Sequence, residues 1–199
     1  MEHRPRRPDY ANRYPTEPMS EWLYTIRKRF TSNPQQRFDD YRGFSGFHHI
    51  RELVTLDSMM CPDVVDELRT EDWDYNVQED FRIELFYDAD YLLARQPLDA
   101  SKHQLIAVLE CPPAHCDVPQ GFTICGHDIM DSYFGNSTLT NCGPIPQAFK
   151  PTDVNDFGLI DDRDQAIAIR DKMKALQPDD DHLGACEVWL LARRFPNVG

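Results

Sequence analysis

The sequence predicts an α+β protein: a mixed or mostly antiparallel sheet with helices packed on one side. Strand-like apolar runs and helical patterns are both present, and irregular stretches separate the strands as often as helices do. The regular strand–helix alternation of a parallel α/β sheet is therefore missing, which favours α+β. No internal repeat and no glycine-rich phosphate loop is found.

The chain has 199 residues, enough for one domain with a sizeable core. Residues 1–18 hold four arginines among four prolines and few large aliphatic side chains. A segment of this composition buries too little apolar surface to fold alone. We therefore expect a flexible basic arm at 1–18 and a single α+β domain at 19–199.

The first part of the domain offers three segments. "SEWLYTIRKRF" (20–30) places Trp22, Leu23, Ile26 and Phe30 at helical spacing behind Ser20 as a possible cap, so we predict a helix there. "TSNPQQRFDDYRGFSGF" follows and is rich in turn residues, which indicates a loop. "HHIRELVTL" (48–56) alternates well enough to predict a strand.

Two helices are expected next. "CPDVVDEL" reads as a helix start because Pro62 suits the first helical position and Asp63 favours the positive end of the dipole. "ADYLLARQ" is preceded by Asp88 as a cap and followed by Pro97 as a stop. Tyr91 would contribute to its buried stripe, together with Leu92.

Three strands are predicted in the second half. "QLIAVLEC" (104–111) is almost wholly apolar and should be central in the sheet. "GFTICGHDIMD" (121–131) alternates around Gly126, which suggests a bulge or bend. "ACEVWLLARR" (185–194) is the strongest β-forming run.

The segment before the last strand, "DDRDQAIAIRDKMKALQP", predicts an amphipathic helix. Aspartates lie at its start, where the helix dipole favours them, and a proline lies just beyond its end. Its expected buried face consists of Ala166, Ile169, Met173 and Leu176.

Charge restricts the classes of partner. The chain has 34 acidic and 21 basic residues, a net charge of −13. This field repels nucleic acid and anionic membranes and attracts basic protein surfaces, although it also serves solubility alone. No apolar run is long enough for a membrane span or a secretion signal, so we expect a cytoplasmic protein with reduced cysteines.

The acids concentrate in one stretch. Between Asp63 and Asp90 there are eleven acidic residues and two arginines, a local net charge of −9, with aromatic residues among them. The simpler interpretation is that these acids form a solvated face. The functional interpretation is a surface that binds a basic protein, in which aromatic side chains anchor the partner and acidic side chains steer its approach. The candidate partner-binding residues are Glu71, Asp72, Trp73, Asp74, Tyr75, Glu79 and Asp80.

A zinc site is a weaker candidate. The window "CPPAHCDVPQGFTICGH" carries ligand types that zinc prefers. Its spacing contains no paired-cysteine knuckle, although Cys125 and His127 would share one face of a strand. We therefore predict no cofactor; the candidate ligands, should zinc bind, are Cys111, Cys116, Cys125 and His127, with His115 beside them.

Cys142 raises a catalytic alternative. It lies between an asparagine and a glycine in "LTNCGPIP", where a sharp turn could present a thiolate. Candidate bases are His48, His49, His127 and His182. No nucleophile motif is present, and the surrounding residues are turn formers, so a structural role in a loop is the favoured interpretation.

Several strings resemble a loose group of small, uncharacterised bacterial proteins: "CPDVVDEL", "EDWDYNVQEDF", "LTNCGPIPQAF", "VNDFGLID" and "CEVWLLAR". The resemblance covers about residues 45–194 and leaves the basic arm outside. In size, acidity and domain type such proteins are similar to immunity proteins that neutralise bacterial toxins. The resemblance implies a class of function and assigns no functional residue.

These observations lead to one hypothesis and one alternative. The favoured function is a non-enzymatic domain that binds a basic protein, in its sharpest form an immunity-type inhibitor of a basic toxin or nuclease. The alternative is a thiol- or zinc-dependent enzyme that uses Cys142 or the Cys111–His127 window.

Overall fold

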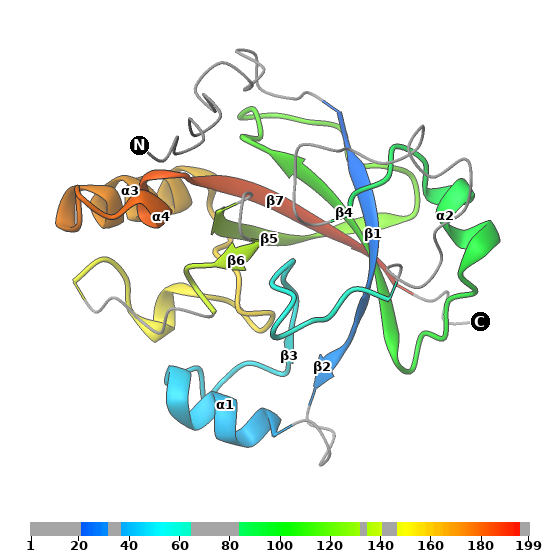
Figure 1. Cartoon of the computed structure of the whole chain (residues 1–199), viewed down its shortest axis with the longest axis horizontal. Helices are drawn as coiled ribbons and strands as arrows, with labels where there is room; N and C mark the ends of the chain where they lie inside the picture. Colours follow the sequence, from blue (N-terminus) through cyan, green and yellow to red (C-terminus); the bar gives the residue numbers. More distant parts are fainter. Residues whose placement is uncertain (1–20, 32–36, 65–83, 132–134, 141–146, 196–199) are drawn as a thin grey trace, which may run out of the picture.

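The computed structural model of the chain describes residues 21–31, 37–64, 84–131, 135–140 and 147–195. In these residues, the strands form a five-stranded antiparallel sheet in the order β1-β4-β7-β5-β6 and a two-stranded sheet, β2-β3 (Figure 1). The α+β class and the antiparallel sheet are therefore confirmed. None of the helices described is long and apolar enough to cross a membrane.

The elements follow one another along the chain as β1 (Leu23–Lys28), β2 (Phe30–Thr31), α1 (Phe38–Ser45), β3 (Glu52–Leu53), α2 (Ala89–Arg95), β4 (His103–Glu110), β5 (Phe122–Asp131), β6 (Asn136–Ser137), the 3-10 helix η4 (Pro151–Asp153), α3 (Arg163–Leu176), α4 (Asp181–Gly184) and β7 (Cys186–Arg194).

Helices α2 and α3 cover the same face of the large sheet. Leu92 of α2 packs with Ile26 and Leu105, which oppose each other on β1 and β4. Ile169 of α3 packs with Val188 on β7. Because β4 and β7 pair without a bulge and opposed residues share a face, Leu105 and Val188 point to the same side.

The opposite face is covered mostly by irregular segments. Trp189 and Leu191 of β7 point to this side, together with apolar residues of β1, β4 and β5. The segments that cover them contribute Val54, Leu56, Leu85 and Leu159. All four side chains are fully buried, so this side is a core, although none of the described helices contributes to it.

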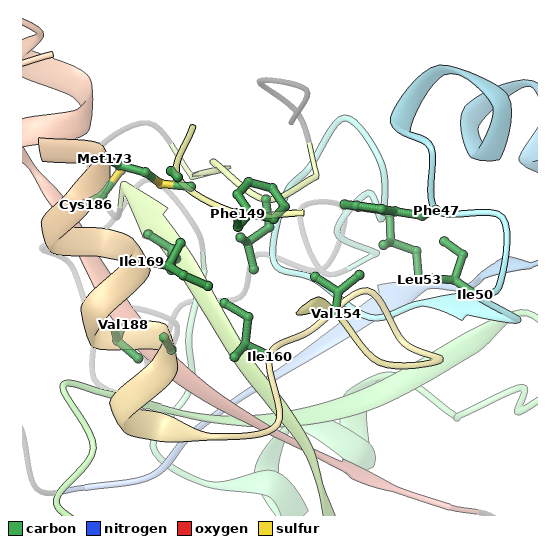
Figure 2. Packing of buried hydrophobic residues seen from close by; sticks show 14 of the residues in the cluster. Phe47, Ile50, Leu53, Phe149, Val154, Ile160, Ile169, Met173, Cys186 and Val188 are labelled. Atoms are coloured by element: carbon green, nitrogen blue, oxygen red, sulfur yellow. The ribbon is translucent and has the colours of Figure 1, made fainter. Parts of the chain in front are cut away.

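A further part of the core joins α1 and the small sheet to the rest. Phe30 of β2 makes edge-on ring contacts with Phe38 and Tyr41 of α1. Figure 2 shows how this cluster continues from Phe47 and neighbouring residues toward α3 and β7. Helix α1, at the bottom of Figure 1, is thus tied to the sheet by a continuous apolar contact.

The predicted strands of the second half are confirmed. β4 lies inside the sheet, and β7 is its central strand. The register of β5 shifts between Ile124 and Gly126, which is the predicted irregularity. The predicted cap at Asp88 is confirmed, because its carboxylate accepts from two backbone N–H groups of α2. The structure adds a cap at the start of α3, where the Asp162 side chain accepts from the Gln165 N–H.

The helix predicted over 20–30 is wrong, because this segment forms β1 and β2. Both faces of β1 are largely buried, so its apolar residues do not alternate with polar ones. Trp22, Ile26 and Phe30 are four residues apart, a spacing that fits one face of a strand as well as a helix. Pairing with β4 decides between the two.

The neighbouring predictions need correction as well. The expected loop contains α1, whose end is set by Gly46 in the left-handed region at φ 74°. Of the strand predicted over 48–56, only β3 forms, since the Val54 N–H bonds to the carbonyl of Phe157 in a distant segment. Leu176, expected on the buried face of α3, is 44% exposed at the end of the helix.

The helix start predicted at Pro62 is also wrong as far as it is described, because residues 61–64 lie along β1. The Pro62 carbonyl accepts from Lys28 N–H, and Val64 N–H donates to the Ile26 carbonyl. The remainder of the predicted helix lies outside the described residues.

Candidate functional site

The predicted partner-binding residues, from Glu71 to Asp80, all lie outside the described residues, which stop at Val64 and resume at Glu84. The structure does define the two flanks of this stretch. β1 lies at one edge of the large sheet and pairs with β4 on its inner side. Both flanks bond to its outer edge.

The first flank is attached at the end of β1. Asp63 forms a β-bridge with Arg27, with hydrogen bonds of 2.9 Å and 3.3 Å on either side. The second flank is attached near the start of β1, where Tyr24 and Phe86 exchange two backbone hydrogen bonds of 2.8 Å. The described residues on either side of the acid-rich stretch are therefore both attached to one edge strand.

Arg27 holds the first flank from within the core. Its side chain is fully buried, and Nη1 donates to the Ser58 hydroxyl at 3.1 Å and to the Cys61 carbonyl at 3.3 Å. Nη2 lies 3.4 Å from Asp63 Oδ2, which also accepts from the Thr25 hydroxyl. A buried charge needs such partners, so this pairing helps to hold Asp63 against β1.

Acidic groups gather at the second flank. Burial raises the pKa of Tyr24, and the nearby carboxylates of Asp88, Glu21 and Asp90 raise it further. All three acids are exposed. Tyr87 in the same region is 41% exposed. The described structure thus brings Glu21, which is distant in sequence, near Tyr24 together with Asp88 and Asp90.

The candidate zinc ligands do not form a site in the described structure. Cys125 is the bulged residue of β5 and packs in the cluster with Leu191, whereas His127 opposes Leu190. Because Leu190 and Leu191 point to opposite faces, the expectation that Cys125 and His127 share a face is wrong. In the described parts of the chain, no three His, Cys, Asp or Glu side chains are placed to hold a metal ion.

The thiols of this window are protonated in their surroundings. Burial raises the pKa of Cys111 to about 11 and that of Cys125 to about 11, and it also raises the pKa of Cys116. Buried Cys61 has a pKa of about 12 for the same reason. Because the thiolate is the nucleophile, none of these four cysteines is activated for nucleophilic attack.

Cys142 lies outside the described residues, but its candidate bases are described. His48 and His49 are exposed, and burial lowers the pKa of His127. His182 differs from them because its Nδ1 lies 2.7 Å from Oδ2 of Asp131, a fully buried carboxylate. A buried carboxylate that orients a partly exposed imidazole is the arrangement of a general base.

Sequence reasoning missed this pair and also a buried polar cluster. Asp128 Oδ1 accepts from the Ser137 hydroxyl at 2.5 Å and from Ile129 N–H at 2.8 Å, and Oδ2 accepts from the Thr55 hydroxyl at 2.8 Å. Asp57, also fully buried, accepts from Ser137 N–H at 3.1 Å. Burial is the main cause that raises the pKa of Asp128 to about 7.

An open groove of about 510 Å³ runs beside the start of β5. We call it the β5 groove; it is lined by β5, by the loop at 154–161 and by His49, whose Nε2 lies 2.8 Å from the Val154 carbonyl oxygen. Ile124 and Phe157 provide apolar surface, and Asp156 and Asp161 are exposed at its rim. Residue type alone does not reveal this feature, since the loop approaches β5 only in the folded chain.

Comparisons with protein-family models, with curated proteins and with solved structures found no match for this chain.

Proposed function

We propose that the chain binds a basic protein through an acidic, aromatic-bearing surface beside the outer edge of β1. The observation that supports this proposal best is the gathering of Glu21, Asp88 and Asp90 around Tyr24, where the acid-rich stretch rejoins the sheet. Acids in such an arrangement steer a basic partner, and aromatic side chains provide buried contact area.

The attachment of both flanks to β1 also supports the proposal, because β1 belongs to a sheet with buried apolar side chains on both faces. A binding segment with fixed ends loses less conformational freedom on association than one with a free end. In its most specific form, the proposed function is that of an immunity-type inhibitor of a basic toxin or nuclease. The net charge of −13 agrees with a basic partner and with salt-sensitive association.

The test is a capture experiment with lysate of the source organism, washed at low and at high salt. The triple variant Glu71→Gln, Asp72→Asn, Asp74→Asn should lose most of a partner that the wild type retains at low salt. The matched control is Asp40→Asn, Asp164→Asn, Asp179→Asn, which changes the net charge equally at exposed positions outside the stretch. Equal retention by both variants, or retention that salt does not alter, contradicts the proposal.

A second candidate function is a thiol-dependent enzyme, and the Asp131–His182 pair is the observation that favours it. In this hypothesis His182 takes the proton of the Cys142 thiol while Asp131 fixes the imidazole tautomer. Alkylation of Cys142 in the folded protein, followed by mass spectrometry across pH 5–9, tests it. The enzyme hypothesis predicts that Cys142 is alkylated rapidly below pH 7 and that its alkylation rate falls in His182→Gln but not in His49→Gln. Equal alkylation rates in the wild type and both variants contradict the hypothesis.

A further inference from the structure

The β5 groove is held in shape before any ligand arrives. The Asn155 side chain uses its full hydrogen-bonding capacity: Nδ2 donates to the Cys125 carbonyl at 2.7 Å and to Asp161 Oδ1 at 2.6 Å. Its Oδ1 accepts from the N–H groups of Phe157 and Leu159. The loop is thereby fixed to β5, and a preorganised groove binds at a lower entropic cost.

The groove opens where the outer edge of β5 becomes accessible. From Cys125 onward that edge is covered, because Asn155 caps the Cys125 carbonyl, Ile160 pairs with His127, and β6 pairs with the end of the strand. Among the described residues, no strand or β-bridge pairs with the outer edge at Phe122–Ile124, although the Phe122 N–H itself donates to the Pro119 carbonyl at 3.0 Å. An extended chain segment can lie along such an edge and place a side chain in the adjoining groove.

The chemistry of the walls indicates which side chain fits. Ile124 is 46% exposed and, with Phe157, offers apolar surface for an alkyl stem. Asp156 and Asp161 provide negative charge at the rim. Asp156 already faces Arg51 at 3.1 Å, but both side chains of this pair are at least half exposed, so a competing cation can replace Arg51 at little cost.

We propose that the β5 groove is a second contact for the basic partner and takes an arginine or lysine side chain from an extended segment of it. This inference rests on the proposed function for the identity of the partner. Arginine and lysine combine an apolar stem with a charged head, which matches an apolar floor with an acidic rim. The volume of about 510 Å³ accommodates one such side chain and its flanking backbone.

The experiment needs no partner protein. The tripeptide acetyl-Val-Arg-Val-amide is titrated into the full chain carrying labelled isoleucine methyl groups, and acetyl-Val-citrulline-Val-amide is the uncharged probe of the same shape. The arginine peptide should shift the Ile124 methyl signal saturably, with a dissociation constant on the order of 1 mM. The citrulline peptide should shift it at least about fivefold less at equal concentration.

Variants separate the groove from the general acidity of the chain. Asp156→Asn with Asp161→Asn should weaken the arginine peptide about fivefold, whereas the exposed control pair Asp164→Asn with Asp171→Asn should leave its affinity unchanged. Equal binding of the two peptides, an unmoved Ile124 signal, or equal loss in both variants overturns the proposal. The capture experiment tests other residues. The proposal for the β5 groove can therefore be contradicted while the proposed function is supported, and the proposed function can be contradicted while peptide binding in the groove is observed.

Discussion

Replacing Asp128 with asparagine should make the protein more stable at pH 8 and remove part of its pH dependence. Asp128 is fully buried, and burial raises its pKa from 3.8 to about 7, with hydrogen bonds from Ser137 and Thr55 opposing the shift. In the folded chain the carboxyl is therefore neutral up to about pH 7, whereas in the unfolded chain it ionises near pH 4. The group stabilises the fold below pH 4, and this contribution is lost as the pH rises to 7.

The size of the effect follows from the shift. A difference of about three pKa units corresponds to about 4 kcal/mol, which accumulates at about 1.4 kcal/mol per pH unit between pH 4 and pH 7. Asparagine mimics the neutral acid: its Oδ1 can accept the bonds from Ser137 and Ile129, and its Nδ2 can donate to the Thr55 hydroxyl. The variant should match the wild type near pH 4 and exceed its free energy of unfolding by about 4 kcal/mol at pH 8.

The assay is urea denaturation of both proteins at pH 4, 5, 6, 7 and 8. The difference between the two curves isolates Asp128, because other shifted groups cancel in it. Burial raises the pKa of Glu110 to about 7, so Glu110 also lowers the free energy of unfolding as the pH rises. Burial lowers the pKa of His127, which has the opposite effect on stability. Each group acts equally in the two proteins. A difference that does not change with pH, or a variant less stable than wild type at pH 8, would refute the reasoning.

Two further predictions concern packing, and urea denaturation tests both. Gly126→Ala should lower the free energy of unfolding by more than about 2 kcal/mol, because Gly126 has φ 137° and a Cβ there would lie 2.8 Å from Cβ of Leu159. Gly43 lies in α1, and a Cβ there would meet no other atom within 4 Å. Gly43→Ala should therefore stabilise the protein by roughly 0.5–1 kcal/mol. Equal effects of the two substitutions would show that the loop does not pack on β5 as described. Ile169→Ala should cost about 2–5 kcal/mol because it leaves a cavity under α3, whereas Leu176→Ala at the exposed helix end should cost less than about 1 kcal/mol.

Local pattern was sufficient for the strongest elements. β4 and β7 are nearly continuous apolar or β-forming runs, and α3 combines a helical stripe with an aspartate cap, so the sequence predicts their type without knowledge of their neighbours. The irregularity at Gly126 was predictable for the same reason, because glycine inside a strand pattern commonly marks a bulge, a bend or a close approach of another segment.

Elements with ambiguous patterns needed their partners. β1 carries a spacing that fits a helix or a strand, and its strand form depends on β4 on one side and the two flanks of the acid-rich stretch on the other. Residues 61–64 similarly become extended because β1 takes up their backbone groups. In both cases tertiary hydrogen bonding outweighs a weak local preference.

For the candidate sites, too, some features follow from the sequence and others depend on the folded chain. Composition alone gives the acidic net charge and its concentration between Asp63 and Asp90, because neither depends on the fold. Only the tertiary structure paired His182 with Asp131, 51 residues away, and enclosed Asp128 with Thr55, 73 residues away. Such pairs are decided by which strands and loops meet, and the low dielectric of the core then changes what their side chains do.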